Sequence, residues 1–265
     1  MQARAFPIGF EGMGLEKIKD RYTFIKKLGS GATAEVNLAW DSLLDRKVAV
    51  KSGEGKELLL QEARYLTMFQ ARFFPVLYEY REEAGRSFLM MEYIRGENLK
   101  ERFHRIGQYT EEEVFRIARS TAEALDYLHT GEEACIYGDI KAENIMVQPD
   151  GVVRLVDLGS LSPVSGHIVR RSLEKREEQG EEVRHRGGTP LYAPPELWKG
   201  RPDRRSDIYA LGKLIEVLLQ MSGERELSPK AERVLTGCLQ ALPEYRYQTM
   251  KQLLTELESY FCDKF

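Results

Sequence analysis

The sequence predicts an α+β protein in which a small antiparallel sheet with one helix precedes a larger, mostly helical part. Two observations predict this class. Short strand-like runs alternate with turn residues in the first third of the chain, whereas apolar residues recur at helical spacing over much of the remainder. The 265 residues can bury one or two cores, and 42% hydrophobic with 31% charged residues is typical of a globular protein.

The first third predicts a strand meander with a single helix. Five runs rich in strand-forming residues are bounded by turn residues, namely residues 22–28, 34–40, 47–51, 76–80 and 87–93. Apolar residues recur at helical spacing at Leu59, Ala63 and Leu66, so a helix is expected over residues 56–69.

Helices predominate from Glu97 onward. Thr110 and Glu113 have the spacing of a capping box, which predicts the start of a long amphipathic helix. Three closing helices, two of them with Ser228 or Thr249 near their starts, are expected over residues 206–219, 229–239 and 248–260.

A hairpin and a long loop interrupt this helical part. Short apolar runs at residues 145–147 and 152–156 flank a Pro-Asp-Gly turn, which predicts a hairpin with polar residues at both of its ends. Residues 161–187 are rich in Arg, Glu and Ser and have no clear buried face, so a long exposed loop is expected there.

Charge and cysteine content exclude several classes of protein. The net charge of -3 comes from interspersed acids and bases, so no broad cationic surface indicates nucleic acid or an anionic membrane. Cys135, Cys238 and Cys262 lack C-x-x-C spacing, which argues against a disulfide framework and a zinc site. No apolar run reaches the roughly 18 residues that span a bilayer. We therefore expect a cytoplasmic protein with neither a nucleic-acid partner nor a membrane segment.

A glycine-rich stretch lies between the first two predicted strands. Its glycines allow backbone amides to approach a phosphate chain, and it reads Leu28-Gly29-Ser30-Gly31-Ala32-Thr33-Ala34-Glu35-Val36. Two glycines between strands more often form only a turn, so this stretch alone is a weak indication.

Lys51 ends an apolar run, and strand alternation places it on the same face as Ala49. Glu62, on the following helix, could supply the anion that a buried lysine requires and hold the ammonium near phosphate oxygens. A solvated lysine at a strand end is the alternative.

Polar residues gather around the predicted hairpin. Asp139, Lys141 and Asn144 precede it, and Asp157 follows it. Carboxylate and amide oxygens suit Mg²⁺, and a second carboxylate could orient a hydroxyl nucleophile. Ordinary turn formation is the alternative for each residue taken alone.

The order of these features resembles the eukaryotic-like (Hanks-type) protein kinase family: glycine-rich turn, Val-Ala-Val-Lys, helix glutamate, Asp-x-Lys-x-x-Asn and Asp-Leu-Gly. The resemblance continues at residues 188–196 and 206–212 and at Arg246, and it covers about residues 22–260. It implies a bilobal protein-kinase-like fold: an extension over 1–21 precedes a catalytic domain over 22–262, which consists of an N-lobe at 22–92 and a C-lobe at 95–262.

The resemblance also implies ATP and Mg²⁺ as cofactors. Asp139 would accept the substrate hydroxyl proton as catalytic base, with Lys141 beside it. Asn144 and Asp157 would hold Mg²⁺.

Nucleotide-binding residues follow from the same resemblance. Lys51, paired with Glu62, would bind the α- and β-phosphates. The other residues assigned to ATP are Leu28, Gly29, Ser30, Gly31, Ala32, Val36, Ala49, Met91, Glu92, Ile94 and Met146.

Lys141 and Thr189 resemble the serine/threonine-directed branch, so a protein substrate is expected. Glu196 and Arg246 resemble the family's buried ion pair, and Asp207 resembles the aspartate that anchors the catalytic loop. Two alternatives remain open: a pseudokinase that binds nucleotide or a partner without catalysis, and a small-molecule kinase of the same fold.

The chain departs from the family pattern mildly at Ala34, where a third glycine is common, and at Leu158, which replaces the usual Phe, and more strongly at three other places. Tyr137-Gly138 replaces His-Arg, so the arginine that would bind a phosphorylated loop is missing, and phosphorylation at Ser162, Ser165 or Ser172 is not expected to be the main switch. Lys51 and Glu62 are only 11 positions apart, which implies a helix trimmed at its start or another glutamate. The segment before Ser228 is short, so no extra helix is expected there.

Overall fold

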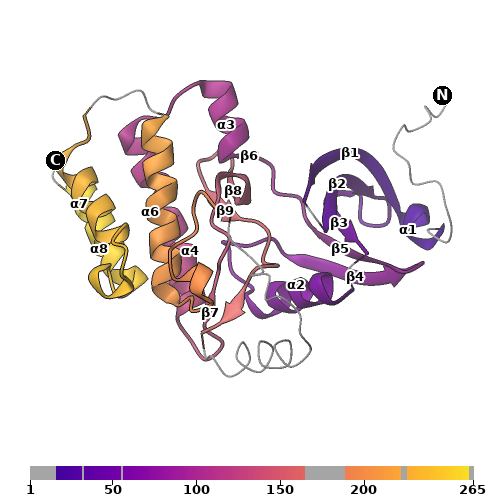
Figure 1. Cartoon of the computed structure of the whole chain (residues 1–265). Helices are drawn as coiled ribbons and strands as arrows, with labels where there is room; N and C mark the ends of the chain where they lie inside the picture. Colours follow the sequence, from indigo (N-terminus) through magenta and orange to yellow (C-terminus); the bar gives the residue numbers. More distant parts are fainter. Residues whose placement is uncertain (1–15, 32, 55, 165–188, 222–225, 263–265) are drawn as a thin grey trace. The chain divides into compact units, whose positions relative to one another are not determined.

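The computed structural model describes residues 16–31, 33–54, 56–164, 189–221 and 226–262 (Figure 1). The chain divides into two compact units, Met1–Ala63 with Leu77–Tyr93 and Arg64–Val76 with Ile94–Phe265. The first contains an antiparallel sheet and the second is mostly helical, which confirms the predicted α+β class. Several predicted features lie outside the described residues: Ala32, Ser165, Ser172, most of the extension over 1–21 and most of the loop over 161–187.

The first unit is built on a five-stranded antiparallel sheet with the order β1-β2-β3-β5-β4. Its strands are β1 (Tyr22–Ser30), β2 (Ala34–Asp41), β3 (Arg46–Gly53), β4 (Leu77–Glu83) and β5 (Arg86–Glu92). The helices are α1 (Glu16–Arg21) and α2 (Lys56–Met68), of which α2 continues into the second unit. All five predicted strands and the predicted helix are confirmed, with small differences at their ends.

Strand β3 is buried on both faces, so its apolar run is continuous rather than alternating. Val48 and Val50 point to one face, where Ile18 of α1 joins them in a single apolar cluster. Ala49 and Lys51 point to the opposite face, as the period of two requires. Helix α1 thus covers the face of the sheet that does not carry Lys51.

Replacing Ile18 with alanine is expected to lower the free energy of unfolding by about 2–5 kcal/mol, because the change removes packed methyl groups and leaves a cavity. Ile18 is 1% exposed. Thermal unfolding followed by circular dichroism measures the loss. Asp20→Ala, at an exposed position of the same helix, is the matched control. Equal midpoints for the two variants would show that α1 adds nothing to the folded unit.

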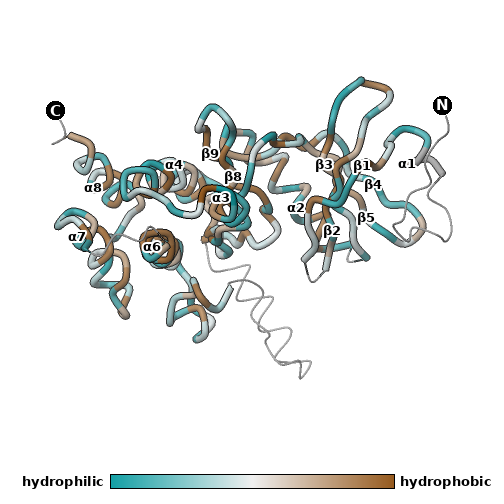
Figure 2. The backbone as a smooth tube through the Cα atoms, turned by 90° about the horizontal axis from the view of Figure 1, so that it is seen from above, coloured by the Kyte–Doolittle hydropathy of each residue, from teal (hydrophilic) through white to brown (hydrophobic). Residues whose placement is uncertain are grey.

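The second unit has a helical core in which α4 packs against α6 and α8. Its helices are α3 (Leu99–Ile106), α4 (Glu111–His129), α6 (Arg204–Gln220), α7 (Pro229–Cys238) and α8 (Met250–Cys262), with short 3-10 turns η1 (Ala142–Asn144), η2 (Leu197–Lys199) and η3 (Pro243–Tyr245). Figure 2 shows the apolar residues that dominate α6. The predicted capping box of α4 is confirmed, since Thr110 accepts from the backbone of Glu113 and the Glu113 side chain accepts from that of Thr110.

Short strands complete the second unit: β6 (Glu97–Asn98), β7 (Cys135–Ile136), β8 (Ile145–Val147), β9 (Val153–Leu155) and β10 (Ser162–Pro163). The hairpin of β8 and β9 is confirmed. The exposed loop expected from residue 161 begins later, because Leu161 is buried and β10 pairs with β7. Between Gln220 and Pro229 the described residues include no helix.

Residues 64–76 fall within the predicted N-lobe range but cluster with the second unit. Backbone and side-chain hydrogen bonds explain this: Leu155 N donates to Phe73 O at 2.8 Å, and the Arg154 guanidinium donates to Phe74 O at 2.6 Å. Within the described residues, no helix combines the length and apolar character that a membrane crossing requires.

Candidate active site

The first unit brings Lys51 and Glu62 together. Lys51 Nζ donates to Glu62 Oε2 at 2.7 Å, and the two residues are 9% and 2% exposed. Strand alternation turns Lys51 toward α2, and the helical period places Glu62 on the same buried face of α2 as Leu59. The spacing of 11 positions therefore belongs to a helix that begins late, and Glu62 is the partner of Lys51.

The glycine-rich turn lies beside this pair in the sheet. Val36 is opposite Lys51 in the β2–β3 ladder. The turn is closed by Gly31 N, which donates to Ala34 O at 2.8 Å. Among the described residues no atom lies within 4 Å of a Cβ built at Gly29, so none of them covers this side of the turn.

Other residues assigned to the nucleotide divide between the units. Ala49 and Met91 are opposite each other in the sheet and share the face of Lys51, while Glu92 is opposite Val48. Leu28 and Ser30 lie in β1. Ile94 and Met146 belong to the second unit, where Ile94 is buried and Met146 lies on β8.

The second unit gathers polar side chains around Asp139. Lys141 Nζ donates to Asp139 Oδ2 at 2.5 Å, and Asn144 Nδ2 donates to the same oxygen at 3.1 Å. The Thr189 hydroxyl donates to Asp139 Oδ1 at 3.3 Å, from a segment 50 positions away. The structure thus assembles a carboxylate surrounded by donors from two separate segments.

Asn144 and Asp157 lie at the same end of the β8–β9 hairpin, because Val156 N donates to Asn144 O at 2.9 Å. Asp157 has a φ of 71°, a left-handed conformation that Asp tolerates better than most residues. Gly159 N donates to Asp157 Oδ1 at 3.1 Å and supports this turn.

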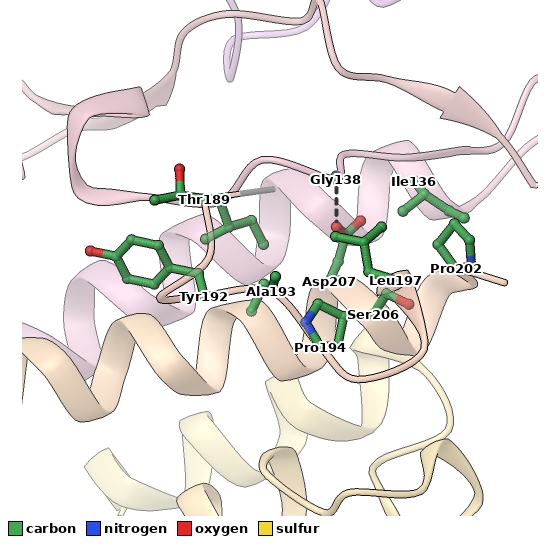
Figure 3. Close-up of a pocket in the computed structure, with 12 residues that line it drawn as sticks. Ile136, Gly138, Thr189, Tyr192, Ala193, Pro194, Leu197, Pro202, Ser206 and Asp207 are labelled. Carbon is green, nitrogen blue, oxygen red and sulfur yellow. Dashed lines mark hydrogen bonds between the residues drawn. The ribbon is translucent and has the colours of Figure 1, made fainter. Parts of the chain in front are cut away.

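Asp207, 1% exposed near the start of α6, anchors the loop that leads to Asp139. It accepts from Tyr137 N at 2.7 Å and from Gly138 N at 2.9 Å, and Figure 3 shows the second bond. A small cavity of about 20 Å³ adjoins this anchor, with room for about one water molecule. The predicted anchoring role of Asp207 is confirmed.

Two contacts were not predicted from the sequence. His129 Nε2 lies 2.8 Å from Asp207 Oδ2 at a buried position. The Tyr137 hydroxyl donates to Val156 O at 2.7 Å and links the loop that leads to Asp139 to the residue that precedes Asp157. The only sequence signals were a histidine at a helix end and a tyrosine in an apolar segment.

The predicted ion pair between Glu196 and Arg246 is confirmed. Arg246 Nη1 donates to Glu196 Oε1 at 2.6 Å, and Nη2 donates to Oε2 at 2.8 Å. The Ser206 hydroxyl also donates to Glu196 Oε1, at 2.8 Å. Burial alone would raise the pKa of the Glu196 carboxyl, but these hydrogen bonds and the Arg246 charge outweigh it and hold that pKa below its usual value.

Comparison with known proteins shows the family. The family model described as protein kinase domain matches residues 22–224, so the chain belongs to the protein kinase family. This confirms the resemblance drawn from the motifs.

Curated relatives carry serine/threonine-kinase names. The chain is 25% identical to the Probable serine/threonine-protein kinase CA_C1728 of Clostridium acetobutylicum, over 91% of this chain and 40% of that protein. It is 24% identical to the serine/threonine-protein kinase PrkC of Bacillus subtilis, over 93% of this chain and 41% of PrkC. It is 29% identical to the serine/threonine-protein kinase PknL of Mycobacterium tuberculosis, over 83% of this chain and 58% of PknL. The chain therefore spans about half the length of these relatives or less.

Proposed function

We propose that this chain is an ATP- and Mg²⁺-dependent protein kinase that phosphorylates serine and threonine hydroxyls. The observation that carries the proposal is the cluster at Asp139. A carboxylate held by Lys141, Asn144 and Thr189 is placed to accept a proton from a hydroxyl group while a lysine ammonium stands beside it.

Asp139 acts as the catalytic base. It takes the proton of the substrate hydroxyl as the oxygen attacks phosphorus. Lys141, 2.5 Å from Asp139, offers a positive charge next to the phosphoryl group that is being transferred. Thr189 fixes the second carboxylate oxygen of Asp139, so the base keeps one orientation.

The residues near the hairpin fit Mg²⁺. The amide nitrogen of Asn144 is engaged by Asp139, which reserves its amide oxygen for coordination, and Asp157 adds a carboxylate. Among the described residues no group of three or more His, Cys, Asp or Glu side chains could hold a metal ion. A site with so few protein ligands suits Mg²⁺ that arrives with nucleotide phosphates and neutralises their charge.

Lys51 fits the phosphates of ATP. The ammonium of Lys51 is held in a fixed position by the buried Glu62 carboxylate, 2.7 Å away. Gly29, whose backbone is uncovered, lies on strand β1 of the same sheet. The side chains of Val36, Ala49 and Met91 offer apolar contact to the adenine ring of ATP.

Serine and threonine are the favoured acceptors. The curated relatives are named serine/threonine kinases, and Lys141 and Thr189 occupy the positions that indicate this branch.

The three cysteines are free, which supports a reducing, cytoplasmic location.

Incubation with ATP, Mg²⁺ and a generic basic protein, followed by mass spectrometry of phosphosites, tests the proposal. We expect phosphoserine or phosphothreonine on the substrate or on the chain itself. Thermal stabilisation by nucleotide without transfer would favour the pseudokinase alternative. Transfer only to small molecules such as choline or aminoglycosides would favour the small-molecule alternative.

Replacing Glu62 with glutamine is expected to reduce phosphate transfer about 10- to 100-fold, because Lys51 loses the charge that orients it toward phosphate. Initial rates at saturating and limiting ATP measure the loss. Glu57→Gln, at an exposed position of the same helix, is the matched control. Unchanged transfer in Glu62→Gln would show that another group orients Lys51.

Replacing Ser162, Ser165 and Ser172 together with alanine is expected to change activity by no more than about twofold, because Gly138 cannot supply the guanidinium that binds a phosphorylated loop. Initial rates of the purified variant and parent measure this. A large loss of activity would contradict the expectation and point to a phosphorylation switch.

A further inference from the structure

A cationic stretch of the second unit follows the segment that contacts Asp139. Thr189, whose hydroxyl donates to Asp139, lines the same small cavity as Leu197 and Pro202 (Figure 3). Turns shorten the path between these residues, since Ala193 N donates to Thr189 O at 3.2 Å. The surface that lies between Leu197 and the start of α6 is therefore close to Asp139.

This surface is exposed and positively charged. Lys199, Arg201 and Arg204 are exposed, and within the described part of the chain none of them forms an ion pair with an acidic side chain. Asp203, the acid that lies among them in the sequence, is already held by Arg205 at 2.5 Å. The three exposed cations therefore keep their charge available to a partner.

Trp198 adds an exposed aromatic ring to these cations. The 3-10 turn η2 directs neighbouring side chains to opposite sides, so Leu197 is buried against the cavity while Trp198 is 55% exposed. Tryptophan and arginine are the residue types most enriched among those that dominate protein–protein binding. The surface thus combines an apolar contact with unpaired positive charge.

The surroundings of Asp139 offer little negative charge to a basic partner. Glu143, the acid nearest to Asp139 in the following sequence, accepts from Lys100 Nζ at 3.0 Å. Glu244, an exposed acid near Arg205, lies outside the stretch that carries Trp198. Charge complementarity therefore favours an acidic partner.

We propose that Trp198, Lys199, Arg201 and Arg204 form a docking surface for an acidic segment of the protein substrate. The inference rests on the proposed function and deepens it, because it names the class of substrate. Carboxylates of the segment pair with the three cations, and an apolar side chain of the segment packs on Trp198. Docking near Asp139 raises the local concentration of the acceptor hydroxyl.

The first measurement is binding of a peptide in the absence of ATP. A fluorescein-labelled peptide with a serine, a leucine and a run of glutamates is titrated with the chain and followed by fluorescence anisotropy. Combining Lys199→Gln, Arg201→Gln and Arg204→Gln is expected to weaken binding about tenfold, because three surface ion pairs are lost. A peptide with lysines in place of glutamates should bind at least about tenfold more weakly to the parent.

A second triple variant is the matched control. Lys47→Gln, Arg64→Gln and Lys251→Gln remove the same charge at exposed positions elsewhere in the chain, so binding of the acidic peptide should match that of the parent. Equal binding by the parent and both triple variants would overturn the proposal, because the attraction would then come from no particular surface.

Replacing Trp198 with alanine is expected to weaken binding of the acidic peptide about fivefold, because the peptide leucine loses its apolar contact. Trp198→Phe keeps an aromatic ring and should stay within about twofold of the parent. An oligothymidylate is titrated in parallel, since aromatic and cationic side chains also bind single-stranded nucleic acid. Binding of the oligothymidylate without binding of the acidic peptide would overturn the proposal.

The second measurement is phosphate transfer to the same peptides. In the triple variant of the surface, kcat/KM for the acidic peptide is expected to fall about tenfold through a higher KM, with kcat unchanged. The generic basic protein lacks these contacts and should be phosphorylated equally by parent and variant. A parent chain that transfers no phosphate would refute the proposed function, yet the anisotropy experiment would still decide the role of the surface.

Discussion

Replacing Asp139 with asparagine is expected to reduce phosphate transfer about 10²- to 10⁴-fold, the range typical for loss of a positioned general base. The carboxylate accepts from Lys141, Asn144 and Thr189. An amide keeps the shape of this group but cannot take the hydroxyl proton. The amide NH₂ group would face two donors if it pointed toward Lys141 and Asn144, whereas on the other side the Thr189 hydroxyl can accept from it, so the amide has one favoured orientation.

Two measurements separate chemistry from binding in this variant. Transfer to a protein substrate is expected to fall, whereas thermal stabilisation by ATP and Mg²⁺ is expected to persist, because Lys51, Asn144 and Asp157 are unchanged. Asp150→Asn, in the exposed turn of the β8–β9 hairpin, is the matched control and should behave as the parent does. Full activity in Asp139→Asn would assign the base to another residue.

Local patterns were sufficient to predict most of the fold and the contact between Lys51 and Glu62. The pairing of Lys51 with Glu62 follows from two periodicities, that of a strand and that of a helix, so a sequence can show it. The capping box at Thr110 and Glu113 is likewise contained within four consecutive residues. Such features need no knowledge of distant parts of the chain.

Contacts between segments far apart in the sequence could not be predicted from local patterns. Asp207 reaches His129 across 78 positions and Tyr137 across 70, and no local pattern connects them. Strands β7 and β10 have two residues each, too few for alternation to appear. Their existence depends on pairing that only the folded unit provides, which is why the start of the predicted exposed loop was misplaced.

Replacing Arg246 with methionine is expected to lower the free energy of unfolding by about 3–5 kcal/mol, because Glu196 is then left buried without its partner. At about 2–4 °C per kcal/mol, the melting temperature should fall by roughly 6–20 °C. Glu196→Gln is expected to lower the free energy of unfolding by less than Arg246→Met does. Arg246 also donates to the backbone oxygens of Arg205, Gln240 and Ala241, and these bonds survive in Glu196→Gln but not in Arg246→Met.

A surface ion pair in the same unit is the control for this comparison. Arg233 and Glu256 are 3.4 Å apart with side chains 70% and 26% exposed, so Arg233→Met should cost less than about 1 kcal/mol. Differential scanning calorimetry of the three variants measures the order. Equal losses of unfolding free energy for Arg233→Met and Arg246→Met would show that the buried Glu196–Arg246 pair stabilises the fold no more than an exposed pair does.

The same pair gives stability a defined dependence on pH. The pKa of the Glu196 carboxyl is lower in the folded chain than its usual value of about 4.3. The contribution of this carboxylate to the free energy of unfolding is therefore complete above that usual value and is lost as pH falls through the folded pKa. Glutamine does not titrate. The difference in melting temperature between the parent and Glu196→Gln is therefore expected to be largest near neutral pH and to shrink below about pH 4. A difference that stays constant from pH 7 to the acid limit would show that the Glu196 carboxyl has the same pKa in the folded and unfolded chains, and the stabilising role assigned to its charge would then be wrong.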